Sequence, residues 1–149
     1  QAHRLEFNLS HSKEFALIAI GQDYPLGIDL EFFSARPYEG IAKSLFSQKE
    51  LATFLKLPNY LKPQAFFHIW AQKEAFIKAC GMGLAYPTKD FDVPVFSPAK
   101  ELVVDHLHKK EWMLRSFMPL VTCAASLCHH PQVEEICFFT LKNCHELFN

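Results

Sequence analysis

The sequence predicts an α+β domain in which an antiparallel sheet packs on one side of a long helix. The helix is predicted at residues 66–84, a stretch without proline whose bulky residues recur at helical spacing and which ends in two glycines. Apolar runs typical of strands lie before it, at residues 14–21 and 26–31, and others follow it. Half of the 149 residues are hydrophobic, so we expect residues 1–149 to form one domain with a buried core.

The two N-terminal apolar runs are predicted to form a hairpin. Residues 14–21 are expected to be a buried strand that is apolar on both faces, and the Gln-Asp-Tyr-Pro stretch at residues 22–25 a turn. The chain then returns through residues 26–31 as a second, antiparallel strand. Because side chains two apart in a strand point to the same face, Asp29 and Glu31 are expected to lie side by side.

Two shorter helices are predicted between the second strand and the long helix. Residues 38–46 show a short helical pattern. Ser47 stands three residues before Glu50, which is the signature of a capping box, and it opens a helix that continues to about residue 57. A loop is expected at residues 57–63, immediately before the long helix.

The C-terminal part of the chain is predicted to complete the sheet. It contains apolar runs of strand length, separated by prolines at positions where turns belong. The four candidate strands are residues 101–104, 112–117, 121–127 and 136–141.

Composition argues against several classes of partner. A formal net charge of −1 leaves no surplus of basic residues to neutralise phosphates, so we expect no nucleic-acid partner. No apolar run approaches the ~20 residues of a membrane span. No signal peptide is recognisable, and we expect a cytoplasmic protein.

The five cysteines are odd in number and irregularly spaced, so we expect reduced and mostly buried thiols. A zinc site is disfavoured because the chain has no Cys-x2-Cys or His-x3-His pair. The residues that such a site would use are Cys128, His129, His130, Cys144 and His145.

Three carboxylates form the first candidate site. Asp29 and Glu31 share a strand face, and Glu74 lies on the long helix, so the three side chains would be able to converge on a hard cation such as Mg²⁺. The alternative is that Glu74 and Lys78, one helical turn apart, are an ordinary solvated ion pair.

Three stretches, taken together and in order, carry a resemblance. They are FNLSHS at residues 7–12, GIDLE at residues 27–31 and FHIWAQKEAFIKACGMGL at residues 67–84. These stretches resemble the motifs of the 4'-phosphopantetheinyl transferase superfamily, of the Sfp-like type. Three ordered motifs at matching intervals are a specific signal, whereas Asp-x-Glu alone would be a weak one.

The resemblance implies transfer of 4'-phosphopantetheine from coenzyme A to a serine of an acyl or peptidyl carrier protein. It implies a Mg²⁺ ion held by Asp29, Glu31 and Glu74, which would offset the charge of the diphosphate. It also implies that Ser10 and His11 contact the phosphates of coenzyme A, as a hydroxyl and an imidazole are able to do.

Further catalytic roles follow from the same resemblance. Lys78 is expected to bind the nucleotide and to stabilise or protonate the leaving phosphate, with Lys73 a weaker candidate for the same work. The proton of the serine would go to Glu74, to Glu50 or to water; a metal beside Glu74 would lower its pKa and favour its role as a ligand. Trp70 is expected to pack in the core beneath the site.

Relatives of the Sfp-like type are pseudodimers of two similar halves with coenzyme A between them. This chain resembles the second half with the motif strand before it. We therefore expect the missing N-terminal half, or a second copy of the chain, to cover the apolar strand at residues 14–21. Residues 44–78 carry a local charge of +3, which would suit an acidic carrier protein.

Two other functions remain open at this point. One is a carrier-protein-binding module that has lost turnover, and it would bind the partner without transfer. The other is a different Mg²⁺-dependent phosphoryl enzyme that uses the same carboxylates, and it would act on phosphoesters without a carrier protein.

Overall fold

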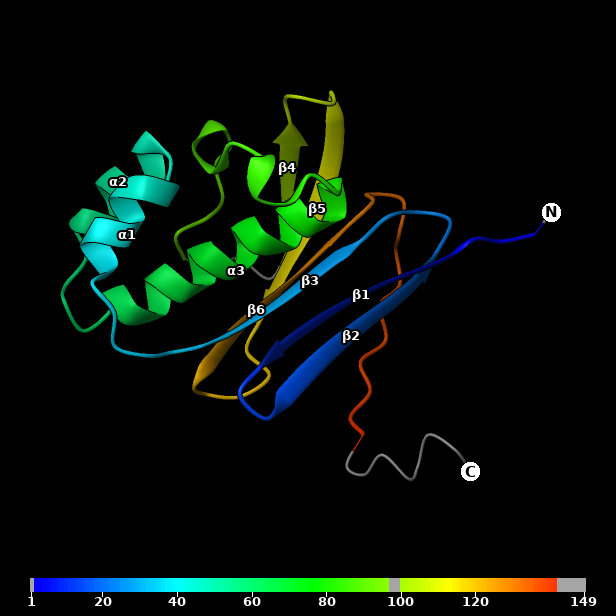
Figure 1. The fold of residues 1–149 in the computed structure, drawn as a ribbon, viewed down its shortest axis with the longest axis horizontal. Coiled ribbons are helices and arrows are strands. Elements are labelled where there is room, and N and C mark those ends of the chain that lie inside the picture. Colours follow the sequence, from blue (N-terminus) through cyan, green and yellow to red (C-terminus); the bar gives the residue numbers. More distant parts are fainter. Residues whose placement is uncertain (1, 97–99, 142–149) are drawn as a thin grey trace.

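The computed structural model describes residues 2–96 and 100–141, and its fold is α+β, as predicted. A four-stranded antiparallel sheet has the order β3-β6-β5-β4, and β1 and β2 form a separate two-stranded hairpin. The long helix α3 runs along one side of the four-stranded sheet (Figure 1). The elements are β1 (Leu5–Ser12), β2 (Phe15–Gln22), β3 (Gly27–Phe32), α1 (Tyr38–Leu45), α2 (Gln48–Leu55), α3 (Lys62–Cys80), β4 (Glu101–Asp105), β5 (Lys110–Phe117) and β6 (Cys123–His129), with 3-10 turns at Gly83–Ala85 and Thr88–Asp90.

The N-terminal hairpin differs from the predicted one. The strand at residues 15–22 pairs with β1, which contains the FNLSHS motif, and β3 pairs with β6 instead. The turn between β1 and β2 has only two residues, and Lys13 there has a positive φ of 53°, as tight hairpin turns require. A two-residue turn holds neighbouring strands in register, whereas the longer connection at residues 23–26 lets β3 leave the hairpin and join the buried sheet.

The helices follow their sequence signals closely. α2 has the predicted capping box, in which the Ser47 hydroxyl accepts from the Glu50 backbone N–H and the Glu50 carboxylate accepts from the Ser47 N–H. α3 begins at Lys62, four residues before the predicted start, because Pro63 is tolerated in a first helical turn. It ends at Gly81, whose φ of 73° is the left-handed conformation that glycine adopts without cost.

The main core lies between α3 and the sheet. Phe66, Phe67, Ile69, Phe76 and Ile77 of α3 are all buried there. β3 and β6 contact α3 directly, and α1 and α2 pack near its N-terminal end (Figure 1). This packing fixes α3 against β3, the strand that carries the predicted carboxylates.

The C-terminal sheet was predicted correctly except for its last strand. β4, β5 and β6 match the first three expected runs to within two residues at each end. Residues 133–141 form no strand, so the predicted strand at residues 136–141 is wrong. β6 already has β3 and β5 as neighbours, and the apolar run instead brings Phe138 against Phe117, with ring centroids 5.3 Å apart.

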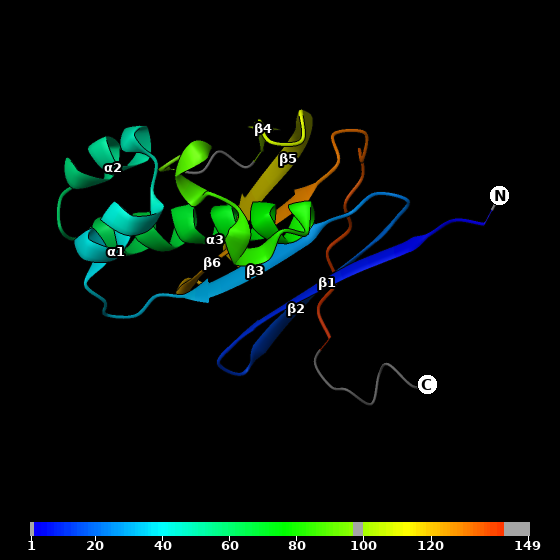
Figure 2. The ribbon, with the colours of Figure 1, turned by 45° about the horizontal axis from the view of Figure 1, so that its top comes forward.

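The β1–β2 hairpin exposes an apolar face. Alternate residues of the two strands point the same way, and the pairs Phe7–Ile20 and Leu9–Ile18 are directly opposite each other. Phe7 and Ile20 are each 70% exposed. Figure 2 shows the hairpin standing beside β3, on the side away from α3. Among the described residues, no helix has the length and apolar character to cross a membrane.

Candidate functional site

β1, β3 and α3 surround one pocket of about 330 Å³. The sequence singled out eight candidate site residues. Six of them line this pocket, and the other two, Glu50 and Lys73, do not. The lining residues are Leu9, Ser10, His11, Ser12, Asp29, Leu30, Glu31, Glu74 and Lys78.

Two polar side chains attach β1 to β3. The Ile28 N–H donates to Asn8 Oδ1 at 2.9 Å, and the Leu30 N–H donates to Ser10 Oγ at 3.0 Å. These bonds satisfy N–H groups on the outer edge of β3, the edge that pairs with no other strand within residues 2–96 and 100–141. They fix the position of β1 along β3, and this position places His11 and Ser12 at the mouth of the carboxylate pocket.

Lys78 reaches β3 because strand and helix are very close. Its Nζ donates to the Ile28 carbonyl and to Asp29 Oδ1, both at 2.8 Å. A Cβ at Gly27 would lie 2.1 Å from the Ala75 carbonyl oxygen, so only glycine permits this approach. Lys78 therefore forms an ion pair with Asp29 across two elements, and not the ordinary i,i+4 pair with Glu74.

The Ser10 hydroxyl is also engaged with β3. It donates to Asp29 Oδ1 at 3.3 Å while it accepts from the Leu30 N–H. Ser10 is buried, whereas His11 is exposed and lines the pocket. In this arrangement Ser10 positions Asp29, and His11 is the member of the pair that is open to a ligand.

The carboxylates of the pocket are crowded in a way that suits a cation. Burial, and then the neighbouring Asp29 carboxylate, raise the pKa of Glu31 to about 7. The same two causes raise the pKa of Glu74. Asp29 Oδ2 is buried and has no hydrogen-bond partner within residues 2–96 and 100–141. An orphaned carboxylate oxygen beside two carboxyls that resist ionisation fits a site for a hard divalent cation with oxygen ligands.

Sequence reasoning missed a second role of Trp70. Its ring stacks on Phe66, as expected of a core residue, with centroids 6.5 Å apart. Its Nε1–H also donates to Glu31 Oε1 at 2.8 Å, and so it orients a predicted metal ligand. The i,i+4 spacing of Trp70 and Glu74, which puts both on one helix face, was a signal that could have found this contact.

Glu50 and Lys73 lie away from the pocket and pair with each other. Their ion pair measures 3.0 Å, and each side chain is 1% exposed. Lys73 Nζ also donates to the carbonyls of Thr88 and Phe91. Glu50 accepts from the backbone N–H of Val93 as well as from that of Ser47.

Burial raises the pKa of Glu50 and lowers the pKa of Lys73, while the attraction between the two opposes both shifts. The predicted roles, proton acceptor for Glu50 and nucleotide contact for Lys73, have no support from this placement. Their hydrogen bonds instead tie α2 and α3 to the segment that follows the long helix.

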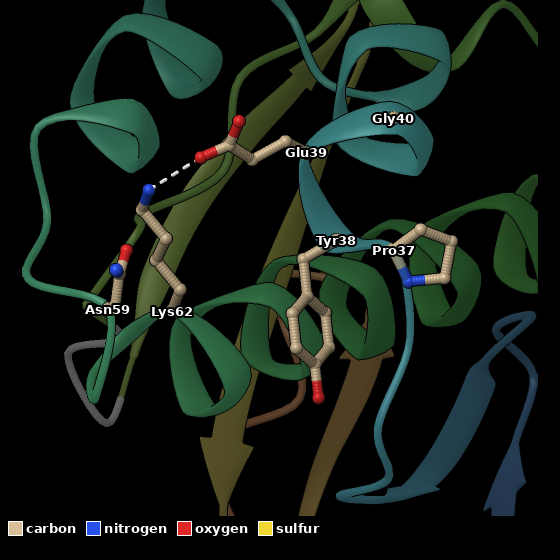
Figure 3. Close-up of a pocket in the computed structure, with 6 residues that line it drawn as sticks. All are labelled: Pro37, Tyr38, Glu39, Gly40, Asn59 and Lys62. Atoms are coloured by element: carbon tan, nitrogen blue, oxygen red, sulfur yellow. Dashed lines mark hydrogen bonds and ion pairs between the residues drawn. The ribbon is translucent and has the colours of Figure 1, made fainter.

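A second pocket lies beside α1 and the start of α3 (Figure 3). It measures about 310 Å³ and its one lysine, Lys62, is paired with Glu39 at 2.7 Å. No carboxylate cluster lines this pocket, so it offers less for phosphate or metal chemistry. Its lining residues are Pro37, Tyr38, Glu39, Gly40, Asn59 and Lys62.

Comparison with known proteins agrees with the resemblance of the motifs. The chain is 43% identical over 84 residues to the 4'-phosphopantetheinyl transferase HetI of a Nostoc species, which covers 54% of this chain and 35% of that protein. It is 38% identical over 87 residues to the 4'-phosphopantetheinyl transferase Sfp of Bacillus subtilis, with 58% and 38% covered. It is 31% identical over 128 residues to the mouse L-aminoadipate-semialdehyde dehydrogenase-phosphopantetheinyl transferase, with 71% and 40% covered. The chain thus spans between about a third and two-fifths of the length of these relatives.

The fold also has a solved counterpart. The crystal structure of Thermotoga maritima holo-[acyl-carrier-protein] synthase matches with a TM-score of 0.55 at 23% identity, over 70% of this chain and 61% of that one. The family model of the 4'-phosphopantetheinyl transferase superfamily matches residues 25–128, which include β3, α3 and the three carboxylates that line the pocket. The chain belongs to the 4'-phosphopantetheinyl transferase superfamily.

Proposed function

We propose that this chain forms the metal- and diphosphate-binding half of an enzyme that transfers 4'-phosphopantetheine from coenzyme A to a serine of a carrier protein. The observation that carries the proposal is the single pocket in which Asp29, Glu31, Glu74 and Lys78 meet the end of the β1 motif. Membership in the superfamily and the names of the relatives support the same reaction.

The reaction breaks a phosphoanhydride bond of coenzyme A and forms a phosphoester bond to the serine. The serine Oγ attacks the phosphorus that bears the pantetheine, the bond from that phosphorus to the oxygen of the second phosphate breaks, and the serine loses its proton. Because a hydroxyl approaches a diphosphate that is already negative, the main requirement is stabilisation of negative charge. A Mg²⁺ ion held by Asp29, Glu31 and Glu74 would supply much of it.

The chain's own residues would supply the rest. Lys78 has three N–H donors, of which Ile28 and Asp29 take two, so one remains for a phosphate oxygen. His11, exposed at the mouth of the pocket, would contact a phosphate. Glu74 is proposed as a ligand of the ion, because a cation lowers the pKa of a nearby carboxyl and makes it a weaker base.

Steering of the carrier protein rests on fewer lysines than the sequence suggested. Of the lysines between residues 44 and 78, Lys62 is paired with Glu39, Lys73 is buried, and Lys78 faces the pocket. Lys49 and Lys56 are exposed and are the ones available for an acidic partner. We also propose a cytoplasmic location, for which the four free cysteines of the described ranges are the support.

We propose that the apolar face of the β1–β2 hairpin is covered by a complementary half of the same fold. Phe7 and Ile20 are too exposed for this face to remain in water, and the relatives are more than twice as long as the segment matched. Light scattering of residues 1–149 alone tests this, with self-association expected. A monodisperse monomer with full transfer activity would exclude the need for any cover, and a stable active dimer would assign the cover to a second copy.

The proposed activity is tested by mass spectrometry of an apo carrier protein after incubation with coenzyme A, Mg²⁺ and the complete protein, in which the complementary half is present. We expect the mass gain of one phosphopantetheine arm. Lys78→Ala is expected to lower turnover more than coenzyme A affinity, because its contact strengthens as charge develops on the leaving phosphate. Lys43→Ala, an exposed lysine of α1 outside the pocket and outside the lysines proposed for steering, is the matched control. Binding of the carrier protein without mass gain would indicate a binding module, and release of phosphate from simple phosphoesters would indicate a different phosphoryl enzyme.

A further inference from the structure

A second group of metal-ligand side chains lies on the other side of α3 from the hairpin. Cys80 is the last residue of α3, Asp105 ends β4, and His108 belongs to the turn between β4 and β5. One potential ligand atom from each residue lies within 4.8 Å of the other two. Figures 1 and 2 both show β4 on one side of α3 and the strands β1 and β2 on the other. The group is therefore separate from the carboxylate pocket.

The Asp105 carboxylate is oriented so that one oxygen serves the fold and the other faces the group. Oδ1 accepts from the Tyr86 hydroxyl at 2.6 Å and from the backbone N–H groups of Leu107 and His108. Oδ2 faces His108 Nδ1 at 2.6 Å and Cys80 Sγ at 3.5 Å. Fixing a ligating carboxylate through its second oxygen is the usual outer support of a metal site.

We propose that Cys80, Asp105 and His108 bind a Zn²⁺ ion. Sulfur, imidazole nitrogen and carboxylate oxygen together form a donor set that zinc prefers and that magnesium does not. A thiolate and a carboxylate also balance the two charges of the ion in a place where Asp105 is fully buried.

The distances from Asp105 to Cys80 and to His108 fit a tetrahedral ion after one small movement. Zinc bonds of about 2.3 Å to sulfur and about 2.0 Å to oxygen separate those two ligands by about 3.5 Å, which is the observed distance from Cys80 to Asp105. Two ligands at about 2.0 Å lie about 3.3 Å apart, so the His108 ring would move outward by less than an ångström. His108 is able to do so because its side chain is 41% exposed, and this exposure leaves a fourth position for water.

The ion would join the C-terminal end of α3 to the β4–β5 turn. Cys80 follows Lys78 by two residues, so zinc would hold the end of the helix that carries the site side chains. Its expected effect is a higher melting temperature, because an ion that binds the folded chain shifts the folding equilibrium. No step of the transfer reaction requires it, and the inference does not depend on the proposed function.

Titration of Co²⁺ into the metal-free protein tests the site. We expect a thiolate-to-cobalt charge-transfer band in the near ultraviolet that disappears when one equivalent of Zn²⁺ is added. The carboxylate pocket has no sulfur among its lining residues and cannot produce this band. Cys80→Ser should abolish the band, and Cys137→Ser, which removes an exposed thiol, should leave it unchanged.

Two histidine variants in the β4–β5 turn provide the decisive comparison. His108→Gln should weaken Co²⁺ binding at least about tenfold and remove the rise in melting temperature with Zn²⁺. His106→Gln changes a neighbouring exposed histidine outside the group and should behave as the parent. Because His108 is on an exposed turn, its variant should fold, and circular dichroism checks this. Absence of the sulfur band in the parent, its loss in Cys137→Ser, or equal Co²⁺ affinity in the His108→Gln and parent proteins would each overturn the proposal and leave a hydrogen-bonded turn.

Discussion

Lys73→Met is expected to destabilise the protein without weakening coenzyme A binding by the folded protein. Lys73 lies within an otherwise apolar core, where its ammonium pairs with Glu50 at 3.0 Å and donates to two carbonyls. Methionine keeps much of the volume and removes the charge. Removing one partner of a buried ion pair costs about 3–5 kcal/mol, because the other partner stays buried without compensation.

We expect the lower end of that range, about 3 kcal/mol. Glu50 keeps the N–H groups of Ser47 and Val93, and burial already raises its pKa, so it is able to take up a proton when Lys73 is gone. A loss of this size is a large fraction of the 5–15 kcal/mol typical of a whole domain. Urea unfolding measures it, with Lys49→Met as the exposed control that should change stability by less than about 0.5 kcal/mol.

A double-mutant cycle separates the pair from its surroundings. Lys73→Met should cost less in a Glu50→Gln background, with a coupling energy of about 1–3 kcal/mol. Isothermal titration of coenzyme A, corrected for the folded fraction, should give an unchanged affinity for Lys73→Met. If Lys73→Met instead keeps its unfolding free energy and loses coenzyme A affinity, then Lys73 faces the ligand and the placement is wrong.

Three further changes test the geometry of the carboxylate pocket. Gly27→Ala should lower the free energy of unfolding in urea by about 1–3 kcal/mol or more, because the new Cβ would meet backbone atoms of α3 at 2.1 and 2.6 Å. Gly40→Ala, whose Cβ would meet nothing within 4 Å, should be neutral or stabilising. Equal effects of the two substitutions would contradict the close approach of β3 and α3. Trp70→Phe removes the N–H that orients Glu31 and should weaken Mg²⁺ binding about 10–100-fold, whereas unchanged binding would deny this orientation. The pKa of Glu31 is raised to about 7, so its protonated form stabilises the metal-free fold; this contribution is fully present below about pH 4.5 and is lost as the pH rises through 7. Mg²⁺ affinity should rise over the same interval. A titration curve of Glu31 centred near 4.5 would refute both expectations.

Most elements of the fold were predictable from local signals in the sequence. The Ser47–Glu50 capping box and the glycine at the end of α3 are short-range features, and both appear as expected. The partner of β3 was not predictable in the same way, because pairing with β6 joins residues about 100 positions apart. The apolar run at residues 136–141 had the composition of a strand, but the sheet had no free neighbour for it next to β6.

The site was predictable where one element carried the signal. The two-residue alternation of side chains in β3 predicted that Asp29 and Glu31 share one face, and the motif of α3 predicted Glu74 and Lys78 as their neighbours. All four line the pocket. Lys73 is adjacent to Glu74 in sequence, but 100° of helix rotation turns its side chain into the core.

Contacts between distant elements could not be foreseen. The spacing of Trp70 and Glu74 placed Trp70 on the site face of α3 but did not name Glu31 as its partner, and no spacing indicated the group of Cys80, Asp105 and His108. Both depend on the packing of α3 against strands from both ends of the chain. The zinc ligands considered from the sequence included Cys144 and His145, which lie outside the described residues.

The most direct test of the account is Mg²⁺ binding by the carboxylates of β3 and α3. Isothermal titration in the presence of coenzyme A should show one ion per chain. Asp29→Asn and Glu74→Gln should each weaken its binding at least about tenfold, as loss of a ligand costs no less than loss of its outer support. Glu39→Gln, an exposed carboxylate of α1, should bind the ion as the parent does. Parent-like Mg²⁺ affinity in either Asp29→Asn or Glu74→Gln would contradict a shared site.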